Sequence, residues 1–245
     1  MRFSPDQILE LSAPLPDAST SSLVQWGAEI VGNALHSSNG YELIATGSIA
    51  NGTATRGSDY DLKVVIDPVP GNPPQPYLLA CKSAVARVIG ERRGDATLEN
   101  KCVTSTTGFD GKSVDIVISY PLSTGTNGVI FWTERGEKII DRPAEHARAL
   151  DALDADSDGG LRSTIRLLKC ARTTLGISEL TSYEIERALM VLPSPSPSVA
   201  DNISHLAGHI ASTPEYKLRS DINGHDGAVY RPTTRSALLR FLQQL

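Results

Sequence analysis

Along this chain of 245 residues, the spacing of the apolar positions changes from the period of a strand to that of a helix. In the first half, short runs of alternating apolar and polar residues are separated by turn-forming residues, which is the pattern of a β-sheet. The predicted strands are Tyr41–Thr46, Asp59–Asp67, Lys101–Thr107, Lys112–Ser119 and one that includes Gly128–Thr133. The dipeptide Asp110-Gly111, between two of these runs, predicts a tight hairpin.

The helical period predicts two helices in the first half of the chain and a series of them in the second. Those in the first half are Ser19–Ser37 and Tyr77–Arg93, and those in the second half begin at Pro143, span Leu161–Leu175, begin near Thr181, and lie near Val199–Ser212 and Thr233–Leu245. Thr181 and Glu184 have the spacing of a capping box. We therefore predict an α+β fold, with a sheet lobe over residues 1–140, a helical lobe over residues 141–245 and a cleft between them.

Composition narrows the class of protein without naming a function. Apolar residues make up 40% of the chain and charged residues 21%, which is typical of a soluble globular protein. The sequence has no run of about 18 apolar residues, so no membrane span is predicted, and its start lacks the pattern of a secretory signal. Three cysteines without metal-like spacing indicate a reducing, cytoplasmic location. The net charge of −5 argues against an extensive nucleic-acid surface but leaves a local basic cleft open.

Two aspartates, Asp59 and Asp61, begin the second predicted strand. Side chains alternate along a strand, so both carboxylates share one face, about 6.5–7 Å apart at Cα. Such a pair repels unless a cation lies between its members, and two Mg²⁺ ions about 3.5–4 Å apart can clamp an in-line phosphoryl displacement. Asp115 is the candidate third carboxylate, because it faces away from Val114 and Ile116, and Asp110 is the next candidate. The alternative is a pair of solvent-facing acids at the end of an edge strand, since Asp-x-Asp is common.

Directly upstream, Gly47 and Ser48 follow the first predicted strand. Glycine lets the backbone approach a phosphate closely, and the free N–H groups of a helix start bind anions. An anion cradle beside a divalent-cation site is what a nucleoside triphosphate with its metal ions requires.

The stretch GSIANGTATRGSDYDLKVVI resembles the signature of the DNA-polymerase-beta-type nucleotidyltransferases, in which Gly-Ser is followed about a dozen residues later by Asp-x-Asp in a strand. The resemblance implies a mixed sheet that carries three carboxylates. It also implies that Asp59 and Asp61 bind two Mg²⁺ ions, with Mn²⁺ as a substitute. Asp115, in the stretch VDIV, would bind one metal ion and help to activate the attacking hydroxyl, and Ser48, beside Gly47, would contact the β- and γ-phosphates.

In the second half, LRSTIRLLKCAR followed by LTSYEIERAL resembles the helical core of the oligoadenylate-synthase and cyclic-dinucleotide-synthase-like (CD-NTase) branch. This resemblance implies that Lys169 and Ser182 contact the triphosphate and that Tyr183 stacks on the base. The likeness runs in patches from about residue 19 to about residue 190, and the last fifty residues are only weakly similar. The alternative is that the basic residues of the first stretch, Arg162, Arg166 and Lys169, form an ordinary solvated helix face.

These observations predict an enzyme that transfers a nucleoside monophosphate from an NTP to a hydroxyl and releases pyrophosphate. The branch implies a cyclic or linear oligonucleotide signal, as in bacterial antiphage signalling. A second reading is transfer to a tRNA end, a protein or a small molecule, although the net charge weighs against tRNA. A third is a catalytically weak module that binds a nucleotide or a partner. The predicted ligand is a nucleoside triphosphate, no membrane is expected, and the sequence leaves open whether there is a protein partner.

One further pattern is set aside. Asp154, Asp156 and Asp158 start like a calcium-binding loop, but Ile165 occupies the position that needs a bidentate glutamate. A linker that caps the following helix is therefore favoured.

Overall fold

The computed structural model describes residues 10–11, 13, 20–36, 40–68, 74–122, 128–218 and 234–245. The chain divides into two compact units. The sheet unit comprises Asp17–Asn51 and Gly57–Glu145, and the helical unit comprises Gly52–Arg56 and His146–Leu245 with the described residues of Met1–Pro16. A five-residue segment thus belongs to the helical unit although its sequence neighbours belong to the sheet unit. The predicted division at residue 140 and the cleft stay predictions.

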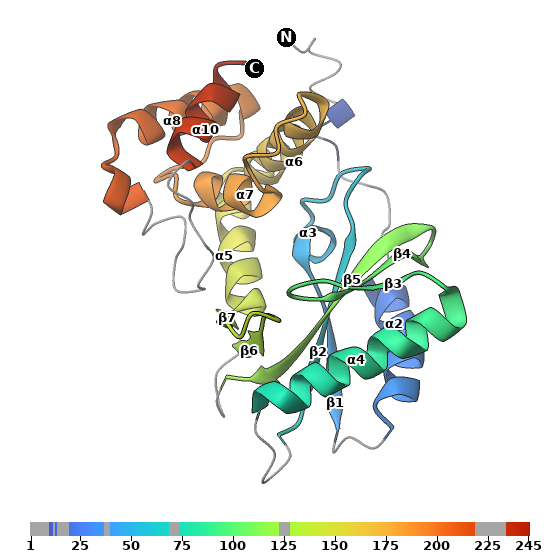
Figure 1. Cartoon of the computed structure of the whole chain (residues 1–245). Coiled ribbons are helices and arrows are strands. Elements are labelled where there is room, and N and C mark those ends of the chain that lie inside the picture. Colours follow the sequence, from blue (N-terminus) through green and yellow to red (C-terminus); the bar gives the residue numbers. More distant parts are fainter. Residues whose placement is uncertain are drawn as a thin grey trace. The chain divides into compact units, whose positions relative to one another are not determined.

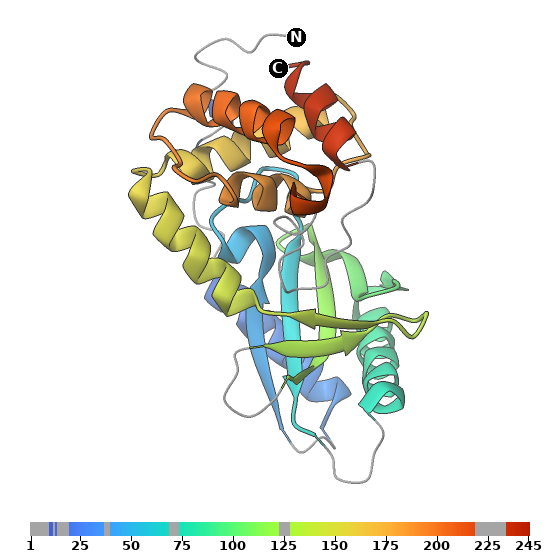
Figure 2. The same cartoon turned by 90° about the vertical axis from the view of Figure 1, so that its left-hand side faces the viewer.

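The sheet unit is built on a mixed sheet with the strand order β1-β2-β5-β4-β3 (Figure 1). Strands β2 and β5 are parallel, and the other neighbouring strands are antiparallel. A further antiparallel pair, β6 and β7, continues from the end of β5 (Figure 2). The strands are β1 Tyr41–Thr46, β2 Tyr60–Ile66, β3 Ala96–Leu98, β4 Val103–Phe109, β5 Lys112–Pro121, β6 Val129–Trp132 and β7 Lys138–Asp141.

One face of this sheet is covered by two helices, α2 (Thr20–Ala34) and α4 (Pro74–Arg93), which pack side by side (Figure 1). The alternation of β2 explains the choice of face, because Leu62 and its next two neighbours on that face are fully buried. Helix α2 comes close to β2 at Gly27, where a Cβ would lie 2.3 Å from Leu62 Cδ2. The opposite face of β2 carries Asp61 and Lys63.

The predicted hairpin is confirmed. Asp110 and Gly111 both have left-handed backbones, with φ of 51° and 69°, and they connect Phe109 to Lys112, which pair across the turn. Such a turn matches the twist of the flanking strands. Strands β3 and β7, of three and four residues, were not predicted.

The helical unit packs its helices around one apolar core (Figure 2). Helix α5 (Pro143–Asp156) begins in the sheet unit and continues into this one. Its partners are α6 Gly160–Thr174, α7 Ser182–Met190, α8 Val199–Ser212 and α10 Thr234–Leu242. Core side chains from all five helices are buried, among them Leu150, Ile165, Ile185, Leu206 and Phe241. The predicted stretch Leu161–Leu175 matches α6 to within one residue at each end.

Two predicted capping contacts are present in this unit, but the linker predicted around Asp154 and Asp156 is wrong, because both residues lie in α5. The capping box of α7 is present, since Thr181 Oγ1 accepts a bond of 3.1 Å from Glu184 N and the Glu184 carboxylate accepts one of 2.7 Å from Thr181 N. Asp154 accepts bonds from the backbone N–H and the guanidinium of Arg162, so it secures the start of α6. In the described ranges, no helix is long and apolar enough to cross a membrane.

Candidate active site

Three predicted site residues, Gly47, Asp61 and Asp115, lie near the end of the sheet at which β1 ends and β2 begins. Asp61 and Asp115 occupy neighbouring positions on the parallel strands β2 and β5, as a pair in register. On its other side, Asp61 pairs with Thr46, the last residue of β1, which directly precedes Gly47. Paired residues of adjacent strands point to the same face, so the Asp61 and Asp115 carboxylates share the sheet face that α2 and α4 leave uncovered. The expected pairing of the two aspartate strands is confirmed.

Gly47 lies directly against the carboxylate of Asp61. Its backbone has a φ of 68°, and a Cβ at this position would lie 1.8 Å from Asp61 Oδ2. Only glycine meets both conditions. Ser48 is half-buried in the one-turn helix α3 (Gly47–Ala50), which follows β1 without an intervening residue. The Gly-Ser pair therefore adjoins the carboxylates in space as well as in the signature.

Asp115 is oriented by a hydroxyl that the sequence did not single out. Thr104, its pairing partner on β4, donates a hydrogen bond of 2.6 Å from Oγ1 to Asp115 Oδ1. The Cys102 thiol lies 3.6 Å from the same hydroxyl. Burial, and then the negative charge of Asp115, raise the pKa of Cys102 to about 11, so this thiol stays protonated near neutral pH. Thr104 could have been found from the predicted hairpin, because it occupies the position on the neighbouring strand that pairs with Asp115.

Asp59 immediately precedes β2 and is exposed. Partial burial of its carboxyl, and then the negative charge of Asp115, raise the pKa of Asp59 above its ordinary value. A divalent cation would relieve this repulsion, and carboxylate oxygens are the ligands that Mg²⁺ prefers. In the part of the chain that the structure describes, no three His, Cys, Asp or Glu side chains lie close enough together to bind a metal ion in this conformation. Carboxylate chemistry and the pairing of Asp61 with Asp115 suit a divalent cation, although the side chains are not gathered around one point in this conformation.

The other predicted site residues, Lys169, Ser182 and Tyr183, belong to the helical unit. Lys169 is only 4% exposed. Its ammonium donates bonds of 2.9 Å to Glu186 Oε2 and to Thr53 Oγ1. Ser182 is the half-buried first residue of α7. The predicted contacts of Lys169 and Ser182 with a triphosphate stay predictions.

Tyr183 follows Ser182 on α7 and stacks on a histidine. Its ring centroid lies 5.8 Å from that of His146, with 26° between the ring planes. The side chain is 36% exposed, which leaves it able to contact a ligand. Stacking on a base stays a prediction.

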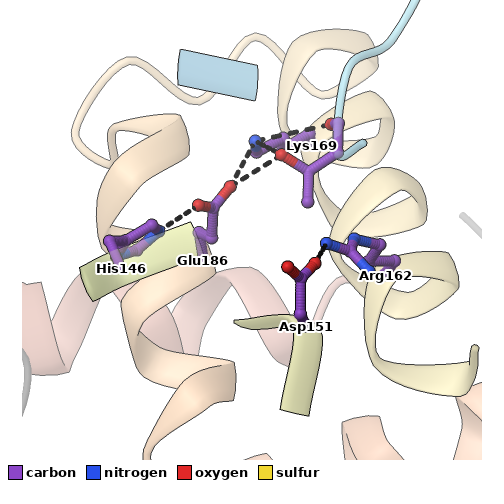
Figure 3. Close-up of polar contacts among 6 residues, drawn as sticks. His146, Asp151, Arg162, Lys169 and Glu186 are labelled. Carbon is purple, nitrogen blue, oxygen red and sulfur yellow. Dashed lines mark hydrogen bonds and ion pairs between the residues drawn. The ribbon is translucent and has the colours of Figure 1, made fainter. Parts of the chain in front are cut away.

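Glu186 joins these residues in a buried charge network (Figure 3). Its carboxylate accepts hydrogen bonds from Thr53 Oγ1 at 2.7 Å and from Lys169, and it contacts His146 Nε2 at 2.5 Å. Burial alone would raise the pKa of Glu186, but the hydrogen bond with His146 and the charge of Lys169 outweigh it and lower that pKa. Sequence reasoning missed Glu186, although an acid between apolar positions of α7 was a signal. It had no means of finding Thr53, which is 133 positions away.

The alternative of a solvated basic face is wrong for two of the three residues it concerned, Arg162, Arg166 and Lys169. Arg166 and Lys169 are both buried. Arg166 Nη1 donates a bond of 2.7 Å to the carbonyl oxygen of Gly52. Arg162 instead pairs with Asp151 (Figure 3) and with Asp154.

Comparisons with known proteins agree with the geometry of the sheet unit. Residues 29–139 match the family model described as the nucleotidyltransferase domain. No curated protein sequence matches this one.

Solved structures match nearly the whole chain. The CdnE cyclic dinucleotide synthase of Elizabethkingia meningoseptica, solved with GTP and Apcpp, is 19% identical; the match covers 99% of this chain and 97% of that one, with a TM-score of 0.76. The CdnE c-UMP-AMP synthase of Rhodothermus marinus is 18% identical over 99% and 96% of the two chains, with a TM-score of 0.71. The CdnC of E. coli MS115-1, in a complex with HORMA-deltaN, is 16% identical over 97% and 87%, with a TM-score of 0.69. The predicted α+β fold is confirmed.

Proposed function

Because this chain is a nucleotidyltransferase with the fold of the CD-NTases, we propose that it transfers a nucleoside monophosphate from an NTP to a hydroxyl with the help of Mg²⁺. In this reaction a bond forms between the acceptor oxygen and the α-phosphorus, the bond to the β-phosphate breaks, and pyrophosphate leaves. The observation that carries the proposal is the convergence of Gly47, Asp61 and Asp115 near the end of the sheet at which β2 begins, with Asp59 two residues from Asp61.

Each carboxylate has a role in the proposal. Asp59, Asp61 and Asp115 would bind two Mg²⁺ ions, or Mn²⁺ in their place, which neutralise charge on the phosphates and on the leaving pyrophosphate. Asp115 would also help to remove the proton of the attacking hydroxyl. The hydroxyl of Thr104, at 2.6 Å from Asp115 Oδ1, fixes the orientation of this carboxylate.

The triphosphate and the base would be bound by the other predicted residues. Gly47 and Ser48 would contact the β- and γ-phosphates. Lys169 would exchange part of its pairing with Glu186 for the triphosphate, and Ser182, at the start of α7, would also contact it. The exposed part of Tyr183 would stack on the base, backed by His146.

The product in this proposal is a cyclic or linear oligonucleotide signal made in the cytoplasm for antiphage defence. Its support is the likeness over nearly the whole chain to proteins described as cyclic dinucleotide synthases. Transfer to a tRNA end, a protein or a small molecule is the second candidate. The net charge of −5 disfavours tRNA, since phosphate contacts need many basic groups. A catalytically weak nucleotide-binding module is disfavoured because all three carboxylates are present.

The test is incubation of the purified protein with each α-labelled NTP, alone and in pairs, with Mg²⁺ or Mn²⁺. Labelled product that survives phosphatase, and whose mass is that of a cyclic or linear oligonucleotide, supports the proposal. The double variant Asp59→Asn/Asp61→Asn is the control and should make none. Label that appears only after a tRNA, protein or small-molecule acceptor is added would favour the second candidate.

A further inference from the structure

The segment Gly52–Arg56 lies in the sequence between Ser48 and Asp59, but it packs in the helical unit. Thr53 is fully buried there, and Ala54 is nearly so. The signature of the proposed active site therefore contains a segment in which Gly52 and Thr53 are bonded by side chains of α6, encoded more than 100 positions later.

The contacts that fix this segment are polar. The hydroxyl of Thr53 donates to Glu186 Oε2 at 2.7 Å and accepts from Lys169 Nζ at 2.9 Å, and Lys169 Nζ also lies 3.4 Å from the Thr53 carbonyl oxygen (Figure 3). Arg166 donates to the preceding carbonyl, that of Gly52. A hydroxyl that donates and accepts at once can be supplied here by Thr or Ser but not by an apolar side chain.

The helices do not need this charged cluster in order to pack against each other. Helices α6 and α7 already meet through apolar side chains, among them Ile165, Leu168, Ile185 and Leu189. A buried ion pair contributes little net stability over an apolar pair of similar volume. What Lys169 and Glu186 achieve that apolar residues would not is to anchor the backbone and hydroxyl of Thr53.

The three carboxylates differ in how the sheet holds them. Asp61 and Asp115 lie within hydrogen-bonded strands and pair with each other. Asp59 lies before the first residue of β2, only three positions after Arg56. Its backbone therefore depends on the anchored segment more than the backbones of the other two do.

We propose that Thr53 is a positioning residue, which through its bonds to Glu186 and Lys169 fixes the segment Gly52–Arg56 and, along the chain, Asp59. The consequence for catalysis rests on the proposed nucleotidyl transfer. Losing the anchor should then weaken divalent-metal binding and turnover, while the KM for the NTP at saturating metal changes little.

Three variants separate positioning from general loosening. Thr53→Val keeps the shape but removes the hydroxyl, and Thr53→Ser restores it. Thr164→Val is the matched control, because Thr164 is also fully buried in this unit and bonds to Gly160 O and to Asn202, away from the segment. The measurements are kcat and KM, Mn²⁺ affinity by electron paramagnetic resonance, and hydrogen exchange of residues 52–58.

We expect kcat and Mn²⁺ affinity each to fall about tenfold in Thr53→Val, the range for residues that orient metal ligands, with faster exchange of residues 52–58. Thr53→Ser and Thr164→Val should stay within about twofold of wild type. Wild-type kcat and Mn²⁺ affinity in Thr53→Val would overturn the proposal, as would an equal loss in Thr164→Val. If the wild-type protein transfers no nucleotide, the proposed function fails. Mn²⁺ affinity and hydrogen exchange of residues 52–58 then test the positioning role of Thr53 without an activity assay. A change in Thr53→Val but not in Thr164→Val supports that role, and no change in Thr53→Val overturns it.

Discussion

A Cβ added to Gly47 would lie 1.8 Å from Oδ2 of Asp61, so the backbone of the one residue sets the position of the other's carboxylate. The two residues are 14 positions apart in sequence and are brought together by the antiparallel pairing of β1 with β2, in which Thr46 lies opposite Asp61. The Gly-Ser pair and the Asp-x-Asp pair of the signature are therefore one structural unit.

This contact predicts the result of Gly47→Ala. The new side chain must move the Asp61 carboxylate or the strand end, so transfer should fall about a hundredfold or more. The matched control is Gly111→Ala, since Gly111 has nearly the same φ of 69° but no atom within 4 Å of its Cβ position. It should lose about 1–2 kcal/mol of unfolding free energy from backbone strain and keep its activity. Urea unfolding and transfer assays on both variants check this, and an active Gly47→Ala would refute it.

Asp115 and Thr104 give a second prediction. Because Asp115 is assigned to prepare the attacking oxygen, Asp115→Ala should lower the single-turnover rate more than the affinity for the NTP. Thr104→Val removes the hydrogen bond that orients Asp115 and should lower the same rate by about tenfold. Equal losses of rate and affinity in Asp115→Ala would make this residue a plain metal ligand. No loss in either would move the assignment to Asp110.

Lys169 has a structural role beside Glu186 and a proposed role in binding the triphosphate, and one set of variants can separate the two. Its ammonium is buried against Glu186, so Lys169→Met leaves that carboxylate with an unmatched charge and should cost about 3 kcal/mol or more of unfolding free energy. The double variant Lys169→Met/Glu186→Gln should recover most of this stability. NTP affinity should stay about ten- to hundredfold weaker in both variants, since the charged contact to the triphosphate is lost. Chemical unfolding and equilibrium binding measure the two effects, and recovery of NTP affinity in the double variant would contradict the phosphate role.

Tyr183 supplies a prediction about the base. Tyr183→Ala should weaken the binding of all four NTPs by about 1–3 kcal/mol, because a stacked ring contacts any base by its face. Tyr183→Phe keeps the ring and should have little effect. His146→Leu, which removes the ring that stacks on Tyr183, should fall between the two. Unchanged NTP affinity in Tyr183→Ala would show that the base does not bind here.

The strands, the hairpin and the cap of α7 could be predicted, because each depends on residues that are close together in the sequence. The alternation of β2 and β5 placed Asp61 and Asp115 on the face away from the core, and the Asp110-Gly111 turn fixed the hairpin that brings β5 back along β4. The capping box at Thr181 likewise depends only on residues three positions apart. Each of these signals lies within about ten residues of the structure that it predicts.

The rest depends on contacts between distant parts of the chain. From the sequence, Lys169 is predicted to be solvated or to bind a ligand. In the structure, Glu186 and Thr53 surround its ammonium group. The segment Gly52–Arg56 reads as a loop of the sheet lobe, yet it packs in the helical unit. Neither periodicity nor turn chemistry carries information over such separations.

The variants Asp59→Asn and Asp61→Asn test the carboxylate account as a whole. Partial burial and the charge of Asp115 raise the pKa of Asp59. The folded protein therefore favours the protonated form of Asp59 more than the unfolded chain does. That contribution to stability is present at low pH and is lost as pH rises through the unfolded and then the folded pKa. Asparagine removes the ionised group. At pH 7 the free energy of unfolding of Asp59→Asn should therefore equal that of wild type or exceed it by less than about 1 kcal/mol.

The most direct measurement is pyrophosphate release from an NTP by wild type, Asp59→Asn and Asp61→Asn, each purified in the same way and assayed at saturating Mg²⁺ and NTP. Unfolding curves of the three proteins are measured in parallel. The account predicts release by wild type and none above background by either variant, while both stay folded. Release by either variant within a few-fold of the wild-type rate would contradict the assignment of these carboxylates to the reaction.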